Sequence, residues 1–259
     1  MNCFCFDIET VPDTDFGRRF WDLDELSDDE IATAMLFKQQ QKTGTDFLPL
    51  HMHRIVAISV TFRSAETFKV WSLGEKTSDE SEIIQRFFDG IALYKPDLVS
   101  WNGSGFDLPV LHYRALRHSI IASDYWDIGN KNQNFKWNNY ISRFHWRHID
   151  LMDVLAGYQL RGRASLDQTS VLLGFPGKLG MSGSNVWKKF QNGAIGEIRD
   201  YCETDVLNTW LIYLRFEYMR GNLDKNELDQ EYSIVHKTLQ KMNQPHLNAF
   251  IKAWHYSNA

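Results

Sequence analysis

Cysteine is scarce, and the sequence lacks a set of cysteine and histidine residues at metal-binding spacing. The chain has three cysteines, Cys3, Cys5 and Cys202. Cys3 and Cys5 have no matching Cys/His cluster elsewhere, so a structural zinc site is not expected. Cysteines in a chain without a secretory leader stay reduced, and we expect these three to be buried thiols. Folds held together by disulfides or structural zinc are therefore not predicted.

Long apolar runs, leader sequences and linkers are also missing. No apolar run reaches the ~18 residues that cross a membrane. The N-terminus runs directly into a predicted strand, without a basic and then apolar leader. These absences predict a soluble, cytoplasmic protein with no membrane partner. No Pro/Gly/Ser linker, low-complexity tract or repeat interrupts the 259 residues, so we expect one domain over residues 1–259.

An excess of basic residues is absent. The chain has 28 Lys and Arg against 33 Asp and Glu, a formal net charge of −5, so any nucleic-acid contact must be local. Residues 128–149 are the exception, because they contain no acid. This stretch is either a wall of a groove that binds single strands or an irregular loop whose rings join the core. Its basic and aromatic residues are Lys131, Phe135, Lys136, Trp137, Tyr140, Arg143, Phe144, Trp146 and Arg147.

The chain alternates between strand and helix patterns and then becomes helical. Runs rich in β-branched residues predict strands at residues 2–8, 54–62, 67–73 and 97–101. Capping boxes at Ser27 and Thr77 and apolar periodicity predict helices at residues 27–41, 77–94, 107–118, 151–158, 166–173, 185–191, 195–220 and 225–242. The acidic residues 12–26 and residues 44–51 are expected to be irregular. This order predicts an α/β fold, a mixed sheet flanked by helices, with a helical C-terminal third.

Two acids stand in the first predicted strand, which is otherwise apolar. Asp7 and Glu9 are separated by one residue. Since the side chains of a strand alternate between its faces, both carboxylates project from the same face. Two buried charges about 6–7 Å apart are costly without a compensating cation, and a hard divalent ion with oxygen ligands is the most economical one. The strand is therefore predicted to form the floor of a metal site.

Two further motifs can supply the missing ligands. Residues 102–107 follow a short predicted strand, and their two glycines permit unusual backbone conformations and a close approach to a ligand. Tyr201 and Asp205 are four residues apart in a long predicted helix, so they lie on one face, where a phenol can orient a metal-activated water. Each motif alone also fits a structural role, as a strand end, a helix N-cap or a helix surface. Together, in this order, they indicate a site.

At these residues the sequence resembles the DEDD superfamily of 3′–5′ exonucleases. It is most similar to the proofreading domains of family-B DNA polymerases and to stand-alone bacterial proteins similar to them. The sister subgroup has a histidine five positions before the last aspartate, where this chain has Asp200, so the tyrosine subgroup is indicated. The resemblance covers about residues 1–220, the motif-bearing core, and a predicted helix follows at about residues 222–243. Its motifs are Asp7-Ile-Glu9-Thr10, Asn102-x-x-x-Phe106-Asp107 and Tyr201-x-x-x-Asp205.

The resemblance implies a ribonuclease H-like fold and a site with two divalent ions, Mg²⁺ or Mn²⁺. It implies Asp7, Glu9 and Asp205 as direct metal ligands and Asp107 as a direct or water-mediated one. Tyr201 would position the attacking water. The 3′-terminal nucleotides would be held by Thr10, Asn102 and Phe106. The long insertion between the first two strands, residues 12–50, departs from the family, and its role is open.

The implied activity is the removal of nucleotides from the 3′ end of single-stranded DNA, with release of nucleoside 5′-monophosphates. RNA is the alternative substrate, because none of the motifs reads a 2′-hydroxyl. An alternative from another class is a nucleic-acid-binding module without turnover, which would not need to keep all four acids and the tyrosine.

Other polar residues have competing interpretations. Lys178 could contact the scissile or a neighbouring phosphate, and Lys188 is a weaker candidate, although surface lysines are common. Asp150 and Asp153 flank a predicted helix start, where capping is preferred over metal ligation. His148 is expected to be a partly buried residue beside Asp150 and not a catalytic base.

Overall fold

The sheet of the protein has five strands of mixed direction. The computed structural model describes residues 2–254. The strands lie in the order β3-β2-β1-β4-β5. The first strand pairs antiparallel with β2 and parallel with β4; β2–β3 is antiparallel and β4–β5 is parallel. The sheet and its flanking helices confirm the predicted α/β class, a mixed sheet flanked by helices. Its strands are β1 (Cys3–Pro12), β2 (His53–Arg63), β3 (Phe68–Ser72), β4 (Asp97–Ser100) and β5 (His148–Asp150).

The central strand β1 is apolar on both faces at its start. Phe4, Phe6 and Ile8 belong to the core cluster under α3 (Glu80–Tyr94) and α4 (Asp107–Arg117). Cys3 and Cys5 belong to the opposite cluster, under α8 (Ile195–Met219). Because faces alternate along a strand, Asp7 and Glu9 continue the cysteine face, toward α8. The two acids therefore lie between the sheet and the longest helix.

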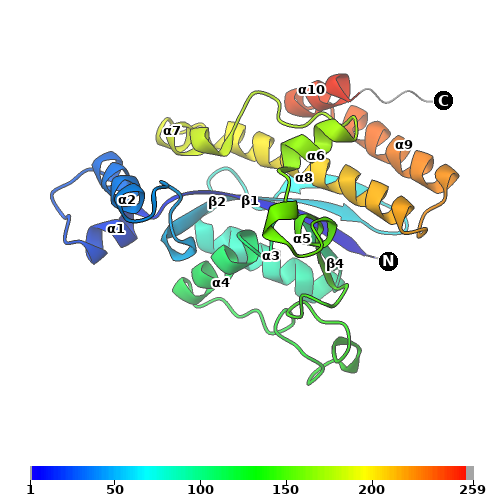
Figure 1. Cartoon of the computed structure of the whole chain (residues 1–259), viewed down its shortest axis with the longest axis horizontal. Coiled ribbons are helices and arrows are strands. Elements are labelled where there is room, and N and C mark those ends of the chain that lie inside the picture. Colours follow the sequence, from blue (N-terminus) through cyan, green and yellow to red (C-terminus); the bar gives the residue numbers. More distant parts are fainter. Residues whose placement is uncertain (1, 255–259) are drawn as a thin grey trace.

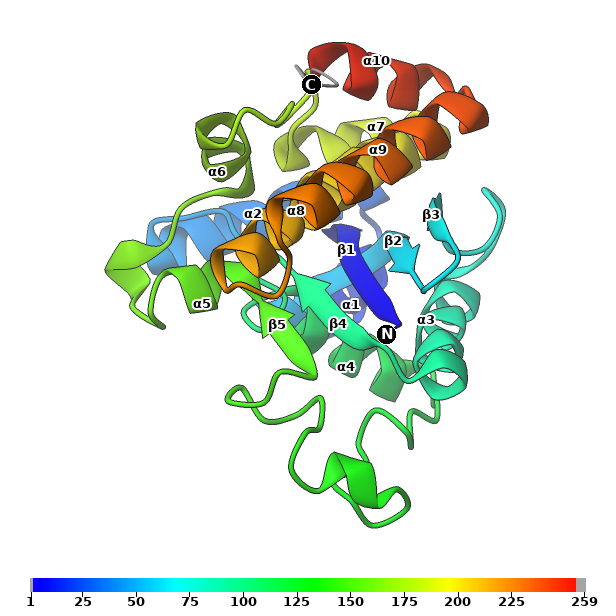
Figure 2. The same ribbon diagram turned by 90° about the vertical axis from the view of Figure 1, so that its right-hand side faces the viewer.

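Further helices pack around α8 (Figures 1 and 2). Beside it lie α9 (Lys225–Met242) and α10 (Pro245–Ala253), which contact α8 and join the same core cluster. The short helices are α5 (Leu151–Leu155), α6 (Leu166–Leu172) and α7 (Val186–Gln191), and the 3-10 turns are η1 (Leu50–Met52), η2 (Gln133–Phe135), η3 (Leu160–Gly162) and η4 (Gly183–Asn185). Within the described residues, no helix is long and apolar enough to cross a membrane.

The insertion, residues 13–52, connects β1 to β2 and projects beyond the end of β1 (Figure 1). It contains α1 (Thr14–Phe20), which was not predicted, and α2 (Asp28–Thr43). As predicted, α2 follows a capping box between Ser27 and Glu30. The strand before it is longer than predicted, with a bulge between Glu9 and Thr10.

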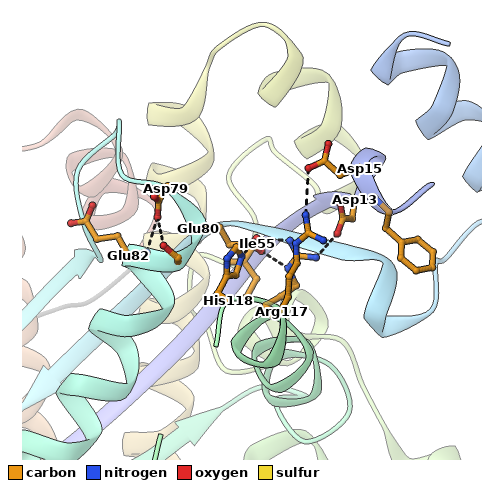
Figure 3. A network of polar contacts seen from close by, with 11 residues as sticks. Asp13, Asp15, Ile55, Asp79, Glu80, Glu82, Arg117 and His118 are labelled. Atoms are coloured by element: carbon orange, nitrogen blue, oxygen red, sulfur yellow. Dashed lines mark hydrogen bonds and ion pairs between the residues drawn. The ribbon is translucent and has the colours of Figure 1, made fainter. Parts of the chain in front are cut away.

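A buried network of charges fixes the base of the insertion to α3 and α4 (Figure 3). Arg114 on α4 forms ion pairs with Asp13 and Glu80, and all three side chains are at most 5% exposed. Glu80 also accepts from His118 Nε2 at 2.8 Å and from the backbone N–H of Ile55 at 2.6 Å. The network ties the end of β1, the start of β2 and two helices into one unit.

One predicted feature was wrong, and two elements besides α1 were missed. The predicted capping box at Thr77 does not form, because Asp79 caps α3 by accepting from Glu82 N–H and Glu80 turns inward to Arg114. Strand β5 was missed, because it has only three residues and depends on pairing with β4. Helix α10 was also missed; the predicted C-terminal helix is α9, and α10 follows it.

Candidate active site

The two acids of β1 share one face, as predicted. Asp7 is half-buried and Glu9 is buried, and each has a carboxylate oxygen within 4.8 Å of the other's and of Cys202 Sγ. This is a metal-compatible cluster among the described residues. Cys202 was not foreseen as a member, because only the packing of α8 on β1 brings it there.

Asp107 joins the pair from the first turn of α4. Its side chain is 3% exposed, and Oδ1 accepts a hydrogen bond from the backbone N–H of Ile8 at 3.1 Å. Because Ile8 lies between Asp7 and Glu9 in sequence, this bond holds the Asp107 carboxylate against the strand that carries both acids. The second motif is thus fixed to the first by a contact across ninety-nine residues.

Helix α8 brings the third motif to the same place. Cys202 Sγ lies 3.4 Å from the backbone oxygen of Asp7 and 3.5 Å from its Oδ2. Tyr201 and Asp205, on either side of Cys202 in this helix, are both buried. The charge of Asp205 contributes to raising the pKa of Asp7 and of Glu9, so the three carboxylates are within electrostatic reach of one another. The three motifs therefore converge.

The carboxylates resist ionisation as a group. Burial, and then the charges of the neighbouring acids, raise the pKa of Asp7 and of Glu9 well above their ordinary values. Burial raises the pKa of Asp107 to about 7 and that of Asp205 to about 6. Burial also raises the pKa of the Tyr201 hydroxyl, so that side chain stays protonated. Such a cluster favours a bound cation that replaces protons.

The donor set fits a hard divalent ion. Each of the four acids offers a carboxylate oxygen as the metal-binding atom. Asp205 Oδ1 is buried without a hydrogen-bond partner among the described residues. A buried acceptor without a partner is costly, and a cation would satisfy it. Burial raises the pKa of the Cys202 thiol, which is therefore protonated in the metal-free protein. The acids therefore offer a set of oxygen ligands that suits a divalent ion.

Lys178 lies at the edge of the cluster. Its Nζ is 5.7 Å from the centre of the Tyr201 ring, and its charge lowers the pKa of Glu9 and of Asp205 against the larger effect of burial. The residue is exposed, and its backbone N–H donates to Asp167 at 2.8 Å. Its positive charge is therefore within electrostatic reach of Glu9 and Asp205.

The turn before Asp107 is held by Asp150, a role that the sequence did not indicate. Asp150 caps α5, as predicted, and also accepts from the backbone N–H groups of Asn102 and Ser104, each at 2.9 Å. The sequence did not indicate this role because Asp150 is the last residue of β5, a strand that was not predicted. Asp153 pairs with Arg163 at 2.6 Å and takes a structural part. His148 is buried, but its partner is Ser100, at 2.8 Å, and not Asp150.

The glycines of this turn serve a different purpose from the one expected. The left-handed conformation belongs to Asn102, at φ 66°. A Cβ on Gly103 would lie 2.2 Å from Ser100 Oγ, and one on Gly105 would lie 2.4 Å from Asn102 Oδ1. Both glycines therefore permit close packing within the turn. The Asn102 carbonyl accepts from Gly105 and Phe106 N–H, so Asn102 shapes the turn itself.

Thr10 and Phe106 line a cavity of about 470 Å³ next to Glu9. Thr10 Oγ1 lies 2.9 Å from His53 Nδ1, and the Phe106 ring contacts the His53 ring with centroids 5.1 Å apart. Two of the three residues expected to hold a 3′-terminal nucleotide thus line one cavity, and Asn102 belongs to the turn beside it.

Some rings of residues 128–149 join the core and others are exposed, as a groove wall would require. Phe135 and Tyr140 are buried in the core, and the Tyr140 hydroxyl donates to the Pro96 carbonyl at 2.7 Å, which fixes the loop at the start of β4. The acids lie beyond the other end of β4. Trp137 and Phe144 are 79% and 76% exposed. The core interpretation is confirmed for the first pair, and a groove wall stays a prediction for the exposed rings.

A comparison with protein families identifies the family of the chain. A family model described as "Predicted 3'-5' exonuclease related to the exonuclease domain of PolB" matches residues 45–254. The match includes residues 102–107 and 201–205 and begins after Asp7 and Glu9. The fold is similar to that of a family B DNA polymerase from the hyperthermophilic archaeon Pyrobaculum calidifontis, with 17% identity, a TM-score of 0.49 and coverage of 93% of this chain and 29% of the polymerase. The chain thus spans less than a third of that polymerase. No curated protein matches it.

Proposed function

Since the chain belongs to a family of predicted 3′–5′ exonucleases related to the exonuclease domain of PolB, we propose that it hydrolyses single-stranded DNA from the 3′ end and releases nucleoside 5′-monophosphates. The observation that carries the proposal is the convergence of Asp7, Glu9, Asp107 and Asp205 from one strand and two helices. The hydrogen bond from Ile8 N–H to Asp107 and the contact of Cys202 with Asp7 support it.

The four acids would hold two divalent ions, Mg²⁺ or Mn²⁺. Such ions, when bound, supply a hydroxide near neutral pH and neutralise charge on the leaving oxygen. Asp7 would be one of the ligands, because Cys202 of the third motif contacts it and the neighbouring Ile8 N–H binds Asp107 of the second. Asp107 is fixed by the backbone of β1 before any ion arrives, so little reorganisation is needed on binding.

The remaining side chains would orient the substrate and the water. Tyr201 keeps its proton, because burial raises its pKa, so its hydroxyl acts as a hydrogen-bonding group toward the attacking water and not as a base. Lys178 would pair with a non-bridging phosphate oxygen at the edge of the site. Thr10 and Phe106 would contact the terminal nucleotide in the neighbouring cavity. Asn102 would act through the turn that it shapes.

DNA is preferred over RNA because the family model is related to an exonuclease domain of a DNA polymerase. The residues assigned to the site would contact phosphates and metal, and none of them is assigned to a 2′-hydroxyl. Digestion of a DNA strand and an RNA strand of the same sequence, side by side, therefore shows whether the enzyme prefers deoxyribose or ribose substrates. A large preference for RNA would overturn the DNA assignment and leave the 3′–5′ exonuclease intact.

The decisive experiment uses 5′-labelled and 3′-labelled single strands with Mg²⁺, Mn²⁺ or EDTA. We expect stepwise shortening from the 3′ end, abolished by EDTA and by Asp7→Ala or Asp205→Ala. Asp89→Asn is a matched control, because Asp89 is an exposed acid on α3, where its partner is Gln85. Wild-type rates in a folded Asp7→Ala or Asp205→Ala variant would overturn the assignment of the site.

A further inference from the structure

The insertion forms one side of the cavity that begins at Glu9. One wall is the end of β1, from Ile8 to Pro12, and another is Phe106. The insertion contributes Leu36 of α2 and residues 46–48, and the remaining side is formed by Gly183, Ser184 and Trp187. A segment with an open role in the sequence thus borders the space next to the catalytic acids.

Three rings meet on this wall. Phe47 from the insertion, His53 from β2 and Phe106 from the second motif contact one another in a triangle. The centroid distances are 5.4 Å for Phe47–His53, 5.1 Å for His53–Phe106 and 5.7 Å for Phe47–Phe106. Phe47 is 56% exposed although it lies in this cluster. A large apolar ring left open toward a cavity offers a contact surface to a ligand.

Both ring nitrogens of His53 are occupied, so the ring is held in place. Nε2 lies 3.1 Å from the Leu48 carbonyl, which can only accept, so Nε2 carries the proton. Burial lowers the pKa of His53 and keeps the ring neutral, so Nδ1 accepts from the Thr10 hydroxyl at 2.9 Å. His53 therefore links the loop that carries Phe47 to the strand that carries Glu9, and has no nitrogen left to read a base.

The wall is also fixed from outside. Asp29 on α2 accepts from Gln191 Nε2 at 2.7 Å and lies 3.4 Å from Trp187 Nε1, both on α7. At its base the insertion is held by the ion pair between Asp13 and Arg114. These contacts hold the insertion, and the hydrogen bond of His53 to the Leu48 carbonyl holds the loop that carries Phe47, before substrate arrives.

From this arrangement we infer that Phe47 binds the base of the 3′-terminal nucleotide by stacking, as a second aromatic contact beside Phe106. The inference rests on the proposed exonuclease function and assigns the insertion to substrate recognition. The cavity, about 470 Å³, is of the size that holds one small ligand. A terminal base must leave its pairing partner to enter it. Stacking accepts every base, because each has a π-face, so the four 3′-terminal bases are expected to be removed at similar rates.

The test compares Phe47→Ala with Phe37→Ala. Phe37 is the matched control, because it is a phenylalanine of the same insertion, on α2, with 62% exposure and no place among the cavity's lining residues. Each protein is given a single strand with an ordinary 3′-terminal nucleotide and the same strand with an abasic one. Binding is measured by fluorescence anisotropy in EDTA, where no hydrolysis occurs, and excision is measured with Mn²⁺.

Phe47→Ala loses the stacking contact with one base. We therefore expect it to bind the ordinary end about 5- to 100-fold more weakly than the wild type does. The KM for excision should rise in parallel, with a smaller change in kcat. The abasic end should bind Phe47→Ala and wild type equally, Phe37→Ala should match wild type on both strands, and Phe47→Tyr should restore binding.

The failures are distinguishable. If Phe47→Ala matches Phe37→Ala on the ordinary end, the inference is wrong while the exonuclease stands. Equal losses on the ordinary and abasic ends would also overturn it, because the residue would then shape the pocket without contacting a base. If the wild type releases no nucleotide with either metal, the proposed function fails, and the inference fails with it.

Discussion

The metal-free carboxylate cluster should make the stability of the protein fall as the pH rises. In the folded chain the pKa of Asp107 is about 7, against an ordinary value of 3.8, because burial penalises the charged form. An acid whose pKa is raised by folding holds its proton more tightly in the folded than in the unfolded chain. Its contribution to stability is therefore complete below pH 3.8 and is lost as the pH rises through about 7.

The size of the effect follows from the difference between the two pKa values. For Asp107 the difference is about three pH units, and each unit corresponds to about 1.4 kcal/mol, which sets a ceiling of about 4 kcal/mol. Asp205, with a pKa of about 6, acts in the same direction, but the acids titrate together and their effects do not add. In a protein of this size 1 kcal/mol corresponds to about 2–4 °C in Tm.

Thermal unfolding in EDTA between pH 5 and pH 8 measures the effect. We expect Tm to fall by several degrees over this range and to recover at pH 8 when Mg²⁺ or Mn²⁺ is added. Asp107→Asn should remove much of the fall, because the amide oxygen can still accept from Ile8 N–H without becoming charged. Asp89→Asn should follow the wild type. A Tm in EDTA that stays level or rises from pH 5 to pH 8 would refute the reasoning.

Three further perturbations have defined outcomes. Arg114→Met should lower the free energy of unfolding by about 3–5 kcal/mol in urea titrations, because it leaves Asp13 and Glu80 buried without their cation; an unchanged midpoint would contradict the network. Tyr201→Phe should lower kcat about 10- to 100-fold with little change in KM, because it deletes one hydrogen bond near the reacting water. Asp150→Ala should reduce excision while metal-free Tm changes by only a few degrees, since it releases two backbone N–H groups of the turn before Asp107.

Sequence periodicity predicted the elements that are long or strongly amphipathic. Helix α9 has the predicted bounds, and α8 differs from its prediction by one residue. The two-residue spacing of Asp7 and Glu9 placed them correctly on one face. These predictions succeed because they depend on local geometry alone.

Elements that depend on distant partners could not be predicted. Strand β5 has three residues and exists through its pairing with β4, and α1 has seven residues in a polar stretch without a clear apolar period. Cys202 entered the acid cluster, and Asp150 came to hold the turn, through contacts between segments far apart in sequence. The triangle of Phe47, His53 and Phe106 likewise joins three separate elements.

The sequence of the insertion can change without moving the acids of the metal site, because the first and last residues of the insertion lie next to each other. Asp13 N–H donates to the Met52 carbonyl at 2.8 Å, and Pro12 pairs with His53 at the end of the β1–β2 ladder. The insertion is thus a long connection within an antiparallel pair, and each doubling of such a connection costs only about 0.6 kcal/mol. Asp7 and Glu9 stay fixed by their own pairing with Ser59 and Ala57. Changes within the insertion should therefore alter which 3′ ends are bound while the positions of the acids stay the same.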